Sequence, residues 1–326
     1  MIPVGSPICG SGWMRKGIEV RRRGAFDARC APERYFKLRN YRRGPMRLVF
    51  WISLLAIGLA SLLCAGGALA GTLVEFPNIA GHTPANLSGY LARPDAGLSA
   101  ELGGSLSGGA PYPAVVVLHG CNGMFGNSAV IADRLSSWGY VTLAVDSLGP
   151  RISGIENRCG SGLPEQAFDA YAALRYLSQL DFVDRARVAV LGQSEGGYRA
   201  LHAEDRDPAT QFFTERFRAV IAYYPYCDIP AAKMTAPTLI LIGAADERNP
   251  VQQCREMVAH ARPDSAPINL IVYPGVHHNF DVALLTPGVR YQGFWLEYNE
   301  QAAKDAEAKT RAFLDAHLAE TEHRIR

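Results

Sequence analysis

The sequence predicts an α/β protein in which a mostly parallel β-sheet carries helices on both faces. Short apolar runs bounded by turn residues recur along the chain, and such runs are typical of strands buried on both faces. Segments with apolar residues at helical spacing alternate with these runs. Strands that alternate with helices form parallel sheets covered on both sides.

Each expected element follows from one of these two patterns. Thr72–Phe76 and Leu87–Ala92 suit outer antiparallel strands. The apolar runs expected to form the central strands are Ala114–Leu118, Val141–Val145, Val188–Leu191, Ala219–Tyr223, Thr238–Ile242 and Asn269–Val272. The segments expected to form helices are Ser128–Trp138, Pro164–Leu180, Tyr198–Glu204, Pro250–Ala261 and Tyr298–Leu318. Pro208–Arg218, with its three phenylalanines, fits either a lid or a core-packed helix, and both alternatives stay open.

Residues 46–70 have the features of an export signal. A basic start at Met46-Arg47 precedes an uncharged apolar run, Leu48–Leu63. Ala68-Leu69-Ala70 then supplies the small residues that a signal peptidase requires. We expect cleavage after Ala70 and export to the periplasm or the extracellular space.

The remainder of the chain divides at this signal. Residues 71–326 are long enough for a single domain with a sizeable core. Residues 1–45 form an Arg-rich extension that lies upstream of the true start if translation begins at Met46. Two alternatives to cleavage stay open: the apolar run is an uncleaved anchor, or Cys64 is a lipoprotein cysteine. Arg42-Arg43 is a weak match to a twin-arginine signal.

The charge of the expected domain limits its partners. After position 70 the chain holds 21 Lys+Arg and 28 Asp+Glu, a formal charge of −7. Nucleic-acid binding requires clustered positive charge, so we expect no nucleic-acid partner. Membrane association is expected only through the export signal.

The expected domain contains four cysteines, Cys121, Cys159, Cys227 and Cys254. An even number of cysteines in an exported chain permits two disulfides, and four cysteines allow three pairings. Their positions at strand ends favour Cys121–Cys159 and Cys227–Cys254, although the sequence alone does not decide the pairing.

A candidate nucleophile follows the expected strand Val188–Leu191. Residues 192–197 are G-Q-S-E-G-G, and an expected helix comes next. In a tight turn from strand to helix, a serine hydroxyl is exposed at the helix N-terminus, and small residues two positions away let the chain fold back. Because the motif lies between a strand and a helix, it predicts Ser194 as the nucleophile. The alternative is a glycine-rich loop without chemistry.

A serine nucleophile needs a base, and the base needs a carboxylate to orient it. His277 and His278 follow the last expected strand, and the residues alone leave open which of them is the base. Asp246 follows the preceding strand and is the expected carboxylate, with Glu247 as the nearest substitute. The order Ser, Asp, His is the one expected for the α/β-hydrolase fold. Two other carboxylates that follow strands, interpreted as loop or structural groups, are Asp146 and Asp228.

The tetrahedral intermediate of acyl transfer needs hydrogen-bond donors for its oxyanion. One expected donor is the backbone N–H of Glu195, the residue after the nucleophile. The other is the N–H of Cys121, in the glycine-rich loop H-G-C-N-G at residues 119–123. We interpret His119 as a brace for this loop rather than as a base. Cys121 and Cys159 lack a strand-to-helix turn around them, which favours a disulfide or inert thiols over catalysis.

Four ordered motifs resemble the dienelactone hydrolase family. They are H-G-C-N-G at 119–123, D-S-L-G-P-R at 146–151, G-Q-S-E-G-G at 192–197 and Y-P-G-V-H-H-N-F-D at 273–281. The resemblance covers nearly all of residues 71–326 and implies that His278, rather than His277, is the base and that Asp246 is the acid. It also implies hydrolysis of esters or lactones. The dienelactone hydrolases proper are cytoplasmic and use a cysteine where this chain has Ser194, so dienelactone itself is a doubtful substrate.

The expected function is hydrolysis of small carboxylic esters or lactones through an acyl-serine intermediate. This mechanism needs no cofactor, and the chain shows neither the spacing typical of a metal site nor a phosphate-binding glycine loop. The same three residues also suit a serine peptidase or an acyltransferase. A non-catalytic binding protein that keeps the fold is the alternative from a different functional class.

Overall fold

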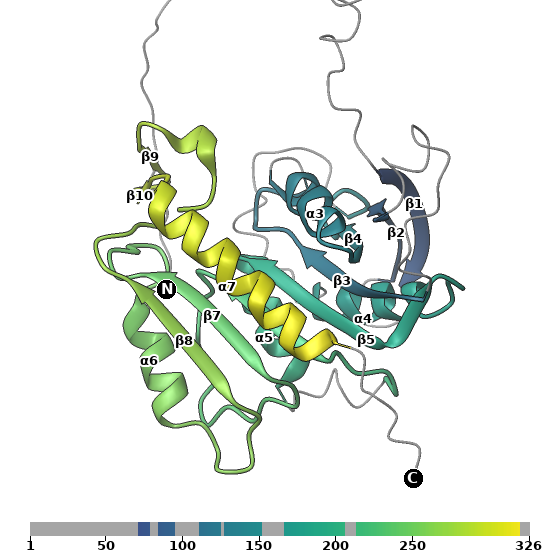
Figure 1. The fold of residues 1–326 in the computed structure, drawn as a ribbon. Helices are drawn as coiled ribbons and strands as arrows, with labels where there is room; N and C mark the ends of the chain where they lie inside the picture. Colours follow the sequence, from purple (N-terminus) through teal and green to yellow (C-terminus); the bar gives the residue numbers. More distant parts are fainter. Residues whose placement is uncertain are drawn as a thin grey trace, which may run out of the picture. The chain divides into compact units, whose positions relative to one another are not determined.

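Within the residues that the computed structural model describes (71–78, 84–94, 111–124, 127–151, 166–205 and 213–319), eight strands form one mostly parallel sheet (Figure 1). The strand order is β1-β2-β4-β3-β5-β6-β7-β8. These residues all belong to one compact unit, Gly67–Arg326. The predictions made for residues 1–70 and for Cys159 lie outside the described residues.

The sheet is antiparallel only at one edge. β1 (Gly71–Asn78) pairs antiparallel with β2 (Ala85–Ala92), which in turn pairs antiparallel with β4. All other neighbours are parallel. The other strands are β3 (Tyr112–Leu118), β4 (Val141–Asp146), β5 (Val183–Gln193), β6 (Ala219–Tyr223), β7 (Thr238–Gly243) and β8 (Ile268–Tyr273). The predicted fold class is confirmed.

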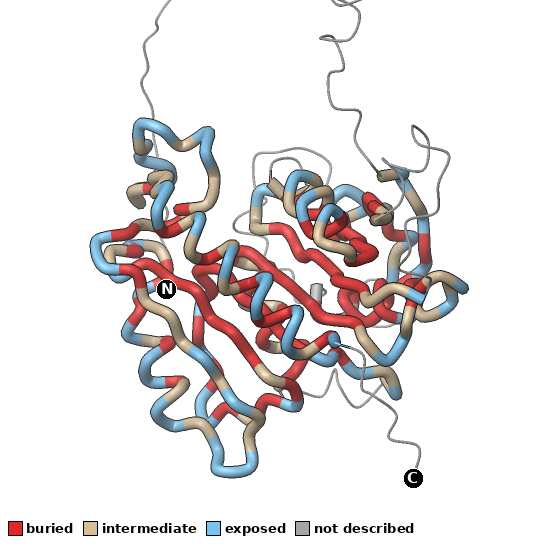
Figure 2. The backbone as a smooth tube through the Cα atoms, viewed as in Figure 1, coloured by how far each residue is buried: buried red, intermediate tan, exposed pale blue. Residues whose placement is uncertain are grey.

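The apolar runs of the central strands are buried, as their sequences require. Every residue of β4 and of β6 is buried, and Figure 2 shows a continuous buried path through the middle of the sheet. Such burial on both faces needs helices on each side. The core therefore fixes the strand ends, from which the candidate functional residues project.

Helices cover both faces of the sheet (Figure 1). On one face, α3 (Ser128–Ser137) and α7 (Glu300–Leu318) are joined by an ion pair between Arg134 and Glu307 at 2.9 Å. On the other face, α4 (Gln166–Leu177) and α5 (Glu195–Glu204) are joined by the Tyr171 hydroxyl, which donates to the carbonyl oxygen of Ala203 at 2.8 Å. The remaining helix, α6 (Val251–Ala259), lies between β7 and β8 in the chain.

The last helix shows how sequence determines an element in this chain. Asn299 caps α7, because its side chain accepts a hydrogen bond from the Ala302 N–H at 2.9 Å. The buried side chains of α7 recur at helical spacing and form one face, which includes Phe313 and Leu314. No helix in the described part of the chain, α7 included, is long and apolar enough to cross a membrane.

One part of the fold was not predicted. Between β8 and α7 the chain forms a short 3₁₀ helix, Ala283–Leu285, and a hairpin of β9 (Val289–Tyr291) and β10 (Phe294–Leu296). We call residues 282–296 the hairpin segment. Gln292 and Gly293 both have positive φ, 51° and 88°, as a two-residue hairpin turn of this type requires.

The segment predicted as either a lid or a helix, Pro208–Arg218, is described only from residue 213. Residues 213–218 form no helix. Phe213 stacks on the ring of Tyr171 at 4.5 Å, and Phe217 lies 5.4 Å from the same ring. The described half of this segment therefore packs against α4 without being helical, and residues 208–212 lie outside the described residues.

Candidate active site

Ser194 lies at a sharp turn between β5 and α5. Its backbone has φ 52° and ψ −114°, a conformation that is strained for a residue with a side chain. The Ser194 N–H donates to the carbonyl oxygen of Tyr223 at 2.9 Å. A β-carbon at Gly192 would lie 2.0 Å from the Gly196 carbonyl oxygen, and one at Gly196 would lie 2.3 Å from that of Leu118. Both glycines are therefore required by close backbone approach.

The structure brings a histidine and a carboxylate to this serine. His278 Nε2 lies 2.9 Å from Ser194 Oγ, and His278 Nδ1 lies 2.7 Å from Asp246 Oδ2. The other carboxylate oxygen, Asp246 Oδ1, accepts from the N–H groups of Arg248 at 2.9 Å and Asn249 at 2.8 Å. Because both oxygens have partners, the orientation of this carboxylate is fixed. A proton on Nδ1 would satisfy the contact with the carboxylate and leave the Nε2 lone pair facing the serine hydroxyl.

His277 and Glu247, which are next to His278 and Asp246 in the sequence, face a different part of the molecule. His277 Nε2 lies 3.9 Å from a carboxylate oxygen of Glu297. Glu247 accepts from the backbone N–H of Trp295 at 3.1 Å. Both contacts are with the end of the hairpin segment or the residue after it. Of the two adjacent histidines, His278 is thus the one that the structure places against the serine.

The loop after β3 passes beside the serine. A β-carbon at Gly120 would lie 3.5 Å from the β-carbon of Ser194. His119 is fully buried, with Nδ1 2.6 Å from the Gly120 carbonyl oxygen and Nε2 accepting from the Ser147 N–H at 3.1 Å. His119 Nδ1 thus contacts its own loop, and His119 Nε2 joins that loop to the loop after β4.

The two expected oxyanion donors lie on the two segments that meet at the serine. Cys121 follows Gly120 directly, and its sulfur is in a disulfide. Glu195 is the first residue of α5, and the first N–H groups of a helix have no acceptor within the helix. The Glu195 side chain forms an ion pair with Arg199 at 2.8 Å. The N-terminus of α5 adds a favourable dipole for negative charge beside Ser194.

The other carboxylates that follow strands have structural contacts. Asp146 Oδ1 accepts from the N–H groups of Leu148 at 3.2 Å and Gly149 at 2.8 Å. Asp228 lies 3.3 Å from His202 Nε2 on the surface. These contacts fit the interpretation of Asp146 and Asp228 as loop or structural groups.

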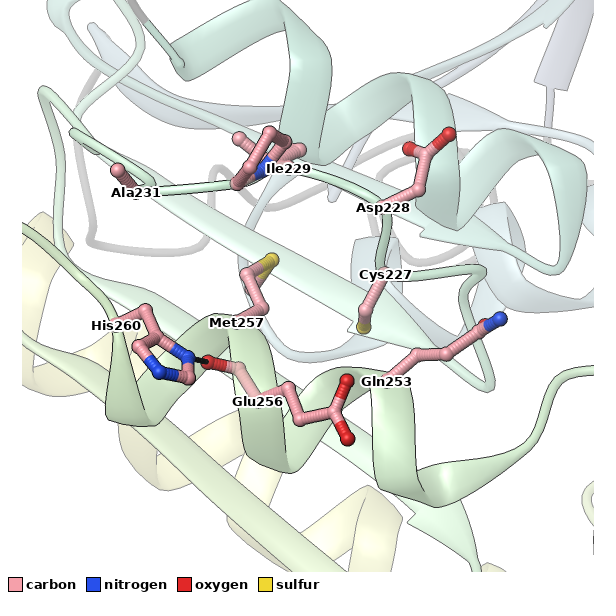
Figure 3. A pocket seen from close by; sticks show the side chains of 9 residues that line it. Cys227, Asp228, Ile229, Ala231, Gln253, Glu256, Met257 and His260 are labelled. Atoms are coloured by element: carbon pink, nitrogen blue, oxygen red, sulfur yellow. Dashed lines mark hydrogen bonds between the residues drawn. The ribbon is translucent and has the colours of Figure 1, made fainter.

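A disulfide joins the segment after β6 to α6. Cys227 and Cys254 form it, as the sequence favoured, whereas the partner of Cys121 lies outside the described residues. Beside this disulfide is a hollow of about 390 Å³ between residues 227–231 and α6, where Glu256, Met257 and His260 line one wall (Figure 3). Its lining does not include Ser194, His278 or Asp246, and we assign it no role.

Sequence reasoning missed three residues that surround the histidine. The ring of Tyr224 lies 4.6 Å from that of His278. The Tyr224 hydroxyl donates to Asp281 at 2.7 Å, and the Gln193 amide donates to Asp281 at 2.6 Å. Burial raises the pKa of Tyr224 well above its usual value and also raises the pKa of Asp281. Gln193 and Asp281 lie within two of the motifs quoted above, but no local signal marks their contacts, because these join segments distant in the chain.

The arrangement supports nucleophilic and acid–base chemistry. A hydroxyl, an imidazole and a carboxylate lie in series, which is the geometry needed to activate a serine. In the described part of the chain, no group of three or more His, Cys, Asp or Glu side chains is arranged to hold a metal ion.

Comparison with known proteins finds relatives in sequence and neighbours in structure. An uncharacterised protein of Mycobacterium tuberculosis is 30% identical over 237 residues, which cover 64% of this chain and 79% of that protein. A dienelactone hydrolase-like promiscuous phosphotriesterase from metagenomic libraries has a TM-score of 0.59 at 18% identity, covering 77% of this chain and 100% of that one. Esterase 2 of Thermogutta terrifontis, solved after phosphorylation by paraoxon, has a TM-score of 0.54 at 14% identity, covering 77% and 96%.

The sequence profile of the dienelactone hydrolase family matches residues 102–318. The match spans the strand ends that carry Ser194, Asp246 and His278. The chain therefore belongs to the dienelactone hydrolase family and is a hydrolase of the α/β-hydrolase fold.

Proposed function

We propose that this hydrolase cleaves small carboxylic esters or lactones through an acyl-serine intermediate. The observation that carries the proposal is the pair of hydrogen-bond contacts that His278 makes, at 2.9 Å to Ser194 and 2.7 Å to Asp246. A histidine so placed accepts the serine proton as the oxygen attacks, and the aspartate stabilises the resulting imidazolium.

The acylation step follows from these positions. Ser194 Oγ forms a bond to the carbonyl carbon while its proton moves to His278 Nε2, and the carbonyl electrons become the oxyanion. The backbone N–H groups of Cys121 and Glu195 donate to that oxyanion. When the tetrahedral intermediate collapses, the ester C–O bond breaks and His278 returns the proton to the leaving alkoxide.

Deacylation repeats the sequence with water. His278 takes a proton from water as its oxygen attacks the acyl carbon, and it then protonates Ser194 Oγ as the acyl–serine bond breaks. The products are a carboxylic acid and the regenerated serine. In a lactone the leaving oxygen stays attached to the acyl chain, so the product is a hydroxy acid.

An activated serine is tested by labelling with a fluorophosphonate. We expect the wild-type protein to be labelled on one site and the Ser194→Ala and His278→Ala variants to remain unlabelled. His277→Ala is the matched control, because it removes the adjacent imidazole, which faces Glu297 instead. Wild-type protein that is folded but unlabelled would contradict the proposal and favour a binding protein that keeps the fold.

The substrate class is tested with matched compounds. We expect turnover of p-nitrophenyl esters and of simple lactones by the wild type and none by Ser194→Ala. Cleavage of peptides, or acyl transfer to alcohols in preference to water, would move the assignment to a peptidase or an acyltransferase on the same residues.

We also infer export with cleavage after Ala70. The Cys227–Cys254 disulfide supports an oxidising compartment. Strand β1 begins at Gly71, so cleavage at this point leaves every residue of the strand in the mature protein. Mass spectrometry of the protein from the periplasm or the culture medium is expected to show Gly71 as the first residue. Intact residues 46–70 in that material would contradict cleavage.

A further inference from the structure

The Asp281 carboxylate accepts hydrogen bonds from three different segments of the chain. Gln193 donates to Oδ2 at 2.6 Å, Asn127 donates to the same oxygen at 3.2 Å, and the Tyr224 hydroxyl donates to Oδ1 at 2.7 Å. Gln193 also donates to the Tyr224 oxygen at 2.9 Å. We call these four residues the Asp281 network. All three partners of the carboxylate are donors, which matches its ionised form.

Each donor lies next to a part of the candidate active site. Gln193 is the residue before Ser194, so its side chain ties the nucleophile's turn to Asp281. The Tyr224 ring packs against the imidazole of His278, at 4.6 Å between ring centres. A hydrogen bond to Gln193 or to Tyr224 therefore restrains a direct neighbour of the serine or of the histidine.

Asn127 joins the network from the side of the loop that carries Cys121, one of the expected oxyanion donors. It stands at the N-cap of α3, a position where asparagine usually accepts from the first turn of its own helix. Here its side chain makes no capping bond and donates to Asp281 instead. Residue 127 follows the loop that carries Cys121, so this contact links the loop's helix to the histidine's segment.

Asp281 is held rigidly relative to the histidine. It follows His278 by three residues, and Asn279 between them has a φ of 60°, which turns the chain back. Phe280 is fully buried and contacts the ring of Tyr224 at 5.5 Å between ring centres. A displacement of Asp281 would therefore move the imidazole as well.

Burial and the neighbouring groups act on the pKa of the Asp281 carboxylate in opposite directions. Asp281 as a whole is partly exposed, but its carboxylate lies deep enough for burial to raise its pKa. The hydrogen bonds from Tyr224 and Gln193 oppose that shift, as does a positive charge on His278.

From these contacts we propose that Asp281 is a positioning residue, which holds the turn of Ser194 and the loop of His278 within hydrogen-bond reach of each other. The inference rests on the proposed function, because it concerns the efficiency of the same serine. Asp281 acts through Gln193 and Tyr224 rather than on the substrate.

The test compares Asp281→Asn with the wild-type protein. The asparagine amide has the same shape as the Asp281 carboxylate, but its NH₂ group replaces one of the two oxygens. The donors that faced that oxygen therefore lose their acceptor. Misplacement of a catalytic group by 1 Å costs about 10²-fold, so we expect kcat for a p-nitrophenyl ester to fall by about 10- to 100-fold. KM and the melting temperature are expected to change little, and the fluorophosphonate labelling rate is expected to fall with kcat.

Two further variants separate positioning from loss of structure. Asp315→Asn is the matched control, because Asp315 accepts from the Tyr140 hydroxyl at 2.6 Å, at the start of β4 and away from the serine. It is expected to keep kcat. Tyr224→Phe keeps the ring against His278 and removes one donor of the network. If the network acts as a unit, the double variant with Asp281→Asn is expected to lose less activity than the two single losses combined.

The outcomes distinguish this inference from the proposed function. Wild-type labelling at Ser194 with unchanged kcat in Asp281→Asn overturns the inference alone. Equal behaviour of the wild type and Ser194→Ala overturns the proposed function and this inference together. If Asp281→Asn does not fold, Tyr224→Phe decides between the alternatives: a lower kcat at constant KM supports positioning, and an unchanged kcat overturns it.

Discussion

Substitution of Gly192 by alanine is expected to open the turn that holds Ser194. The new β-carbon would lie 2.0 Å from the Gly196 carbonyl oxygen and 2.3 Å from its carbonyl carbon, both backbone atoms. Contacts shorter than 3.0 Å do not persist, so the two sides of the turn must separate by roughly 1 Å, a displacement that costs about 10²-fold in rate at an active site. Ser194 lies between these two glycines and must move with them.

The expected result has two components. Overpacking of this kind destabilises a protein by about 1–3 kcal/mol. The contact between Ser194 and His278, 2.9 Å in the native protein, is expected to lengthen beyond hydrogen-bond distance. Labelling by fluorophosphonate is therefore expected to slow by about 10²-fold, alongside a lower free energy of unfolding in urea.

Gly139→Ala supplies the control for this prediction. Gly139 has a φ of 103° and precedes β4, and a β-carbon there would meet no atom within 4 Å. Alanine at this position is strained by its backbone angle, so stability is expected to fall while labelling remains fast. Gly192→Ala protein that labels as fast as the wild type would refute the argument that close backbone approach positions the serine.

Three other predictions concern stability. Loss of the Cys227–Cys254 disulfide, which closes a separation of 27 residues, is expected to lower the free energy of unfolding by about 3.5 kcal/mol, measured by urea denaturation of the Cys227→Ser/Cys254→Ser variant beside the wild type. Arg151→Met leaves the fully buried carboxylate of Asp169 without its cationic partner at 2.8 Å, with only the amide of Asn78, among the described residues, donating to it at 2.6 Å, and is expected to cost about 3–5 kcal/mol in the same assay. Burial raises the pKa of Glu204 above 4.5, so the folded state binds the proton more tightly than the unfolded state. The free energy of unfolding is therefore expected to fall as the pH rises above about 4.5. Glu204→Gln is expected to flatten this pH dependence. Equal stability with and without the disulfide, a fully stable Arg151→Met variant or parallel pH profiles would contradict the respective predictions.

The sequence predicts the parallel part of the sheet because its strands are continuous apolar runs. The strand that precedes Ser194 was predicted only from Val188, whereas β5 begins at Val183. Of residues 183–187, only Val183 is both apolar and buried; residues 184–187 are mostly polar and exposed or half-buried, and Asp184 pairs with Arg187 at 2.6 Å, so this stretch carries no hydrophobic signal. Strand ends that leave the core cannot be found from burial patterns.

The hairpin segment escaped prediction for a related reason. Each of its strands has only three residues, and most of their side chains are exposed or half-buried. Neither a period of two nor an apolar run can be detected over so short a length. The turn pair Gln292-Gly293 was the one local signal, and glutamine is a less typical residue at that position than asparagine.

The candidate site divides in the same way between local and distant information. Ser194 is marked by its own turn, and Asp246 by the strand before it. His277 and His278 are indistinguishable by type and position, and it was the resemblance to a family that selected His278. Tyr224 and Asp281 are 57 residues apart in the chain, so only the folded structure shows their contact.

A serine nucleophile places a strict demand on the position of its base. A cysteine can ionise before its substrate arrives, because a thiol has a pKa of about 8.5 that its surroundings lower readily. A serine hydroxyl stays protonated until it attacks, so in the proposed mechanism its proton passes to His278 Nε2 during bond formation. The 2.9 Å contact therefore has to persist while the substrate is bound. This requirement favours restraints on both sides of the contact. Gln193 provides one before the serine, and Asp281 provides the other after the histidine.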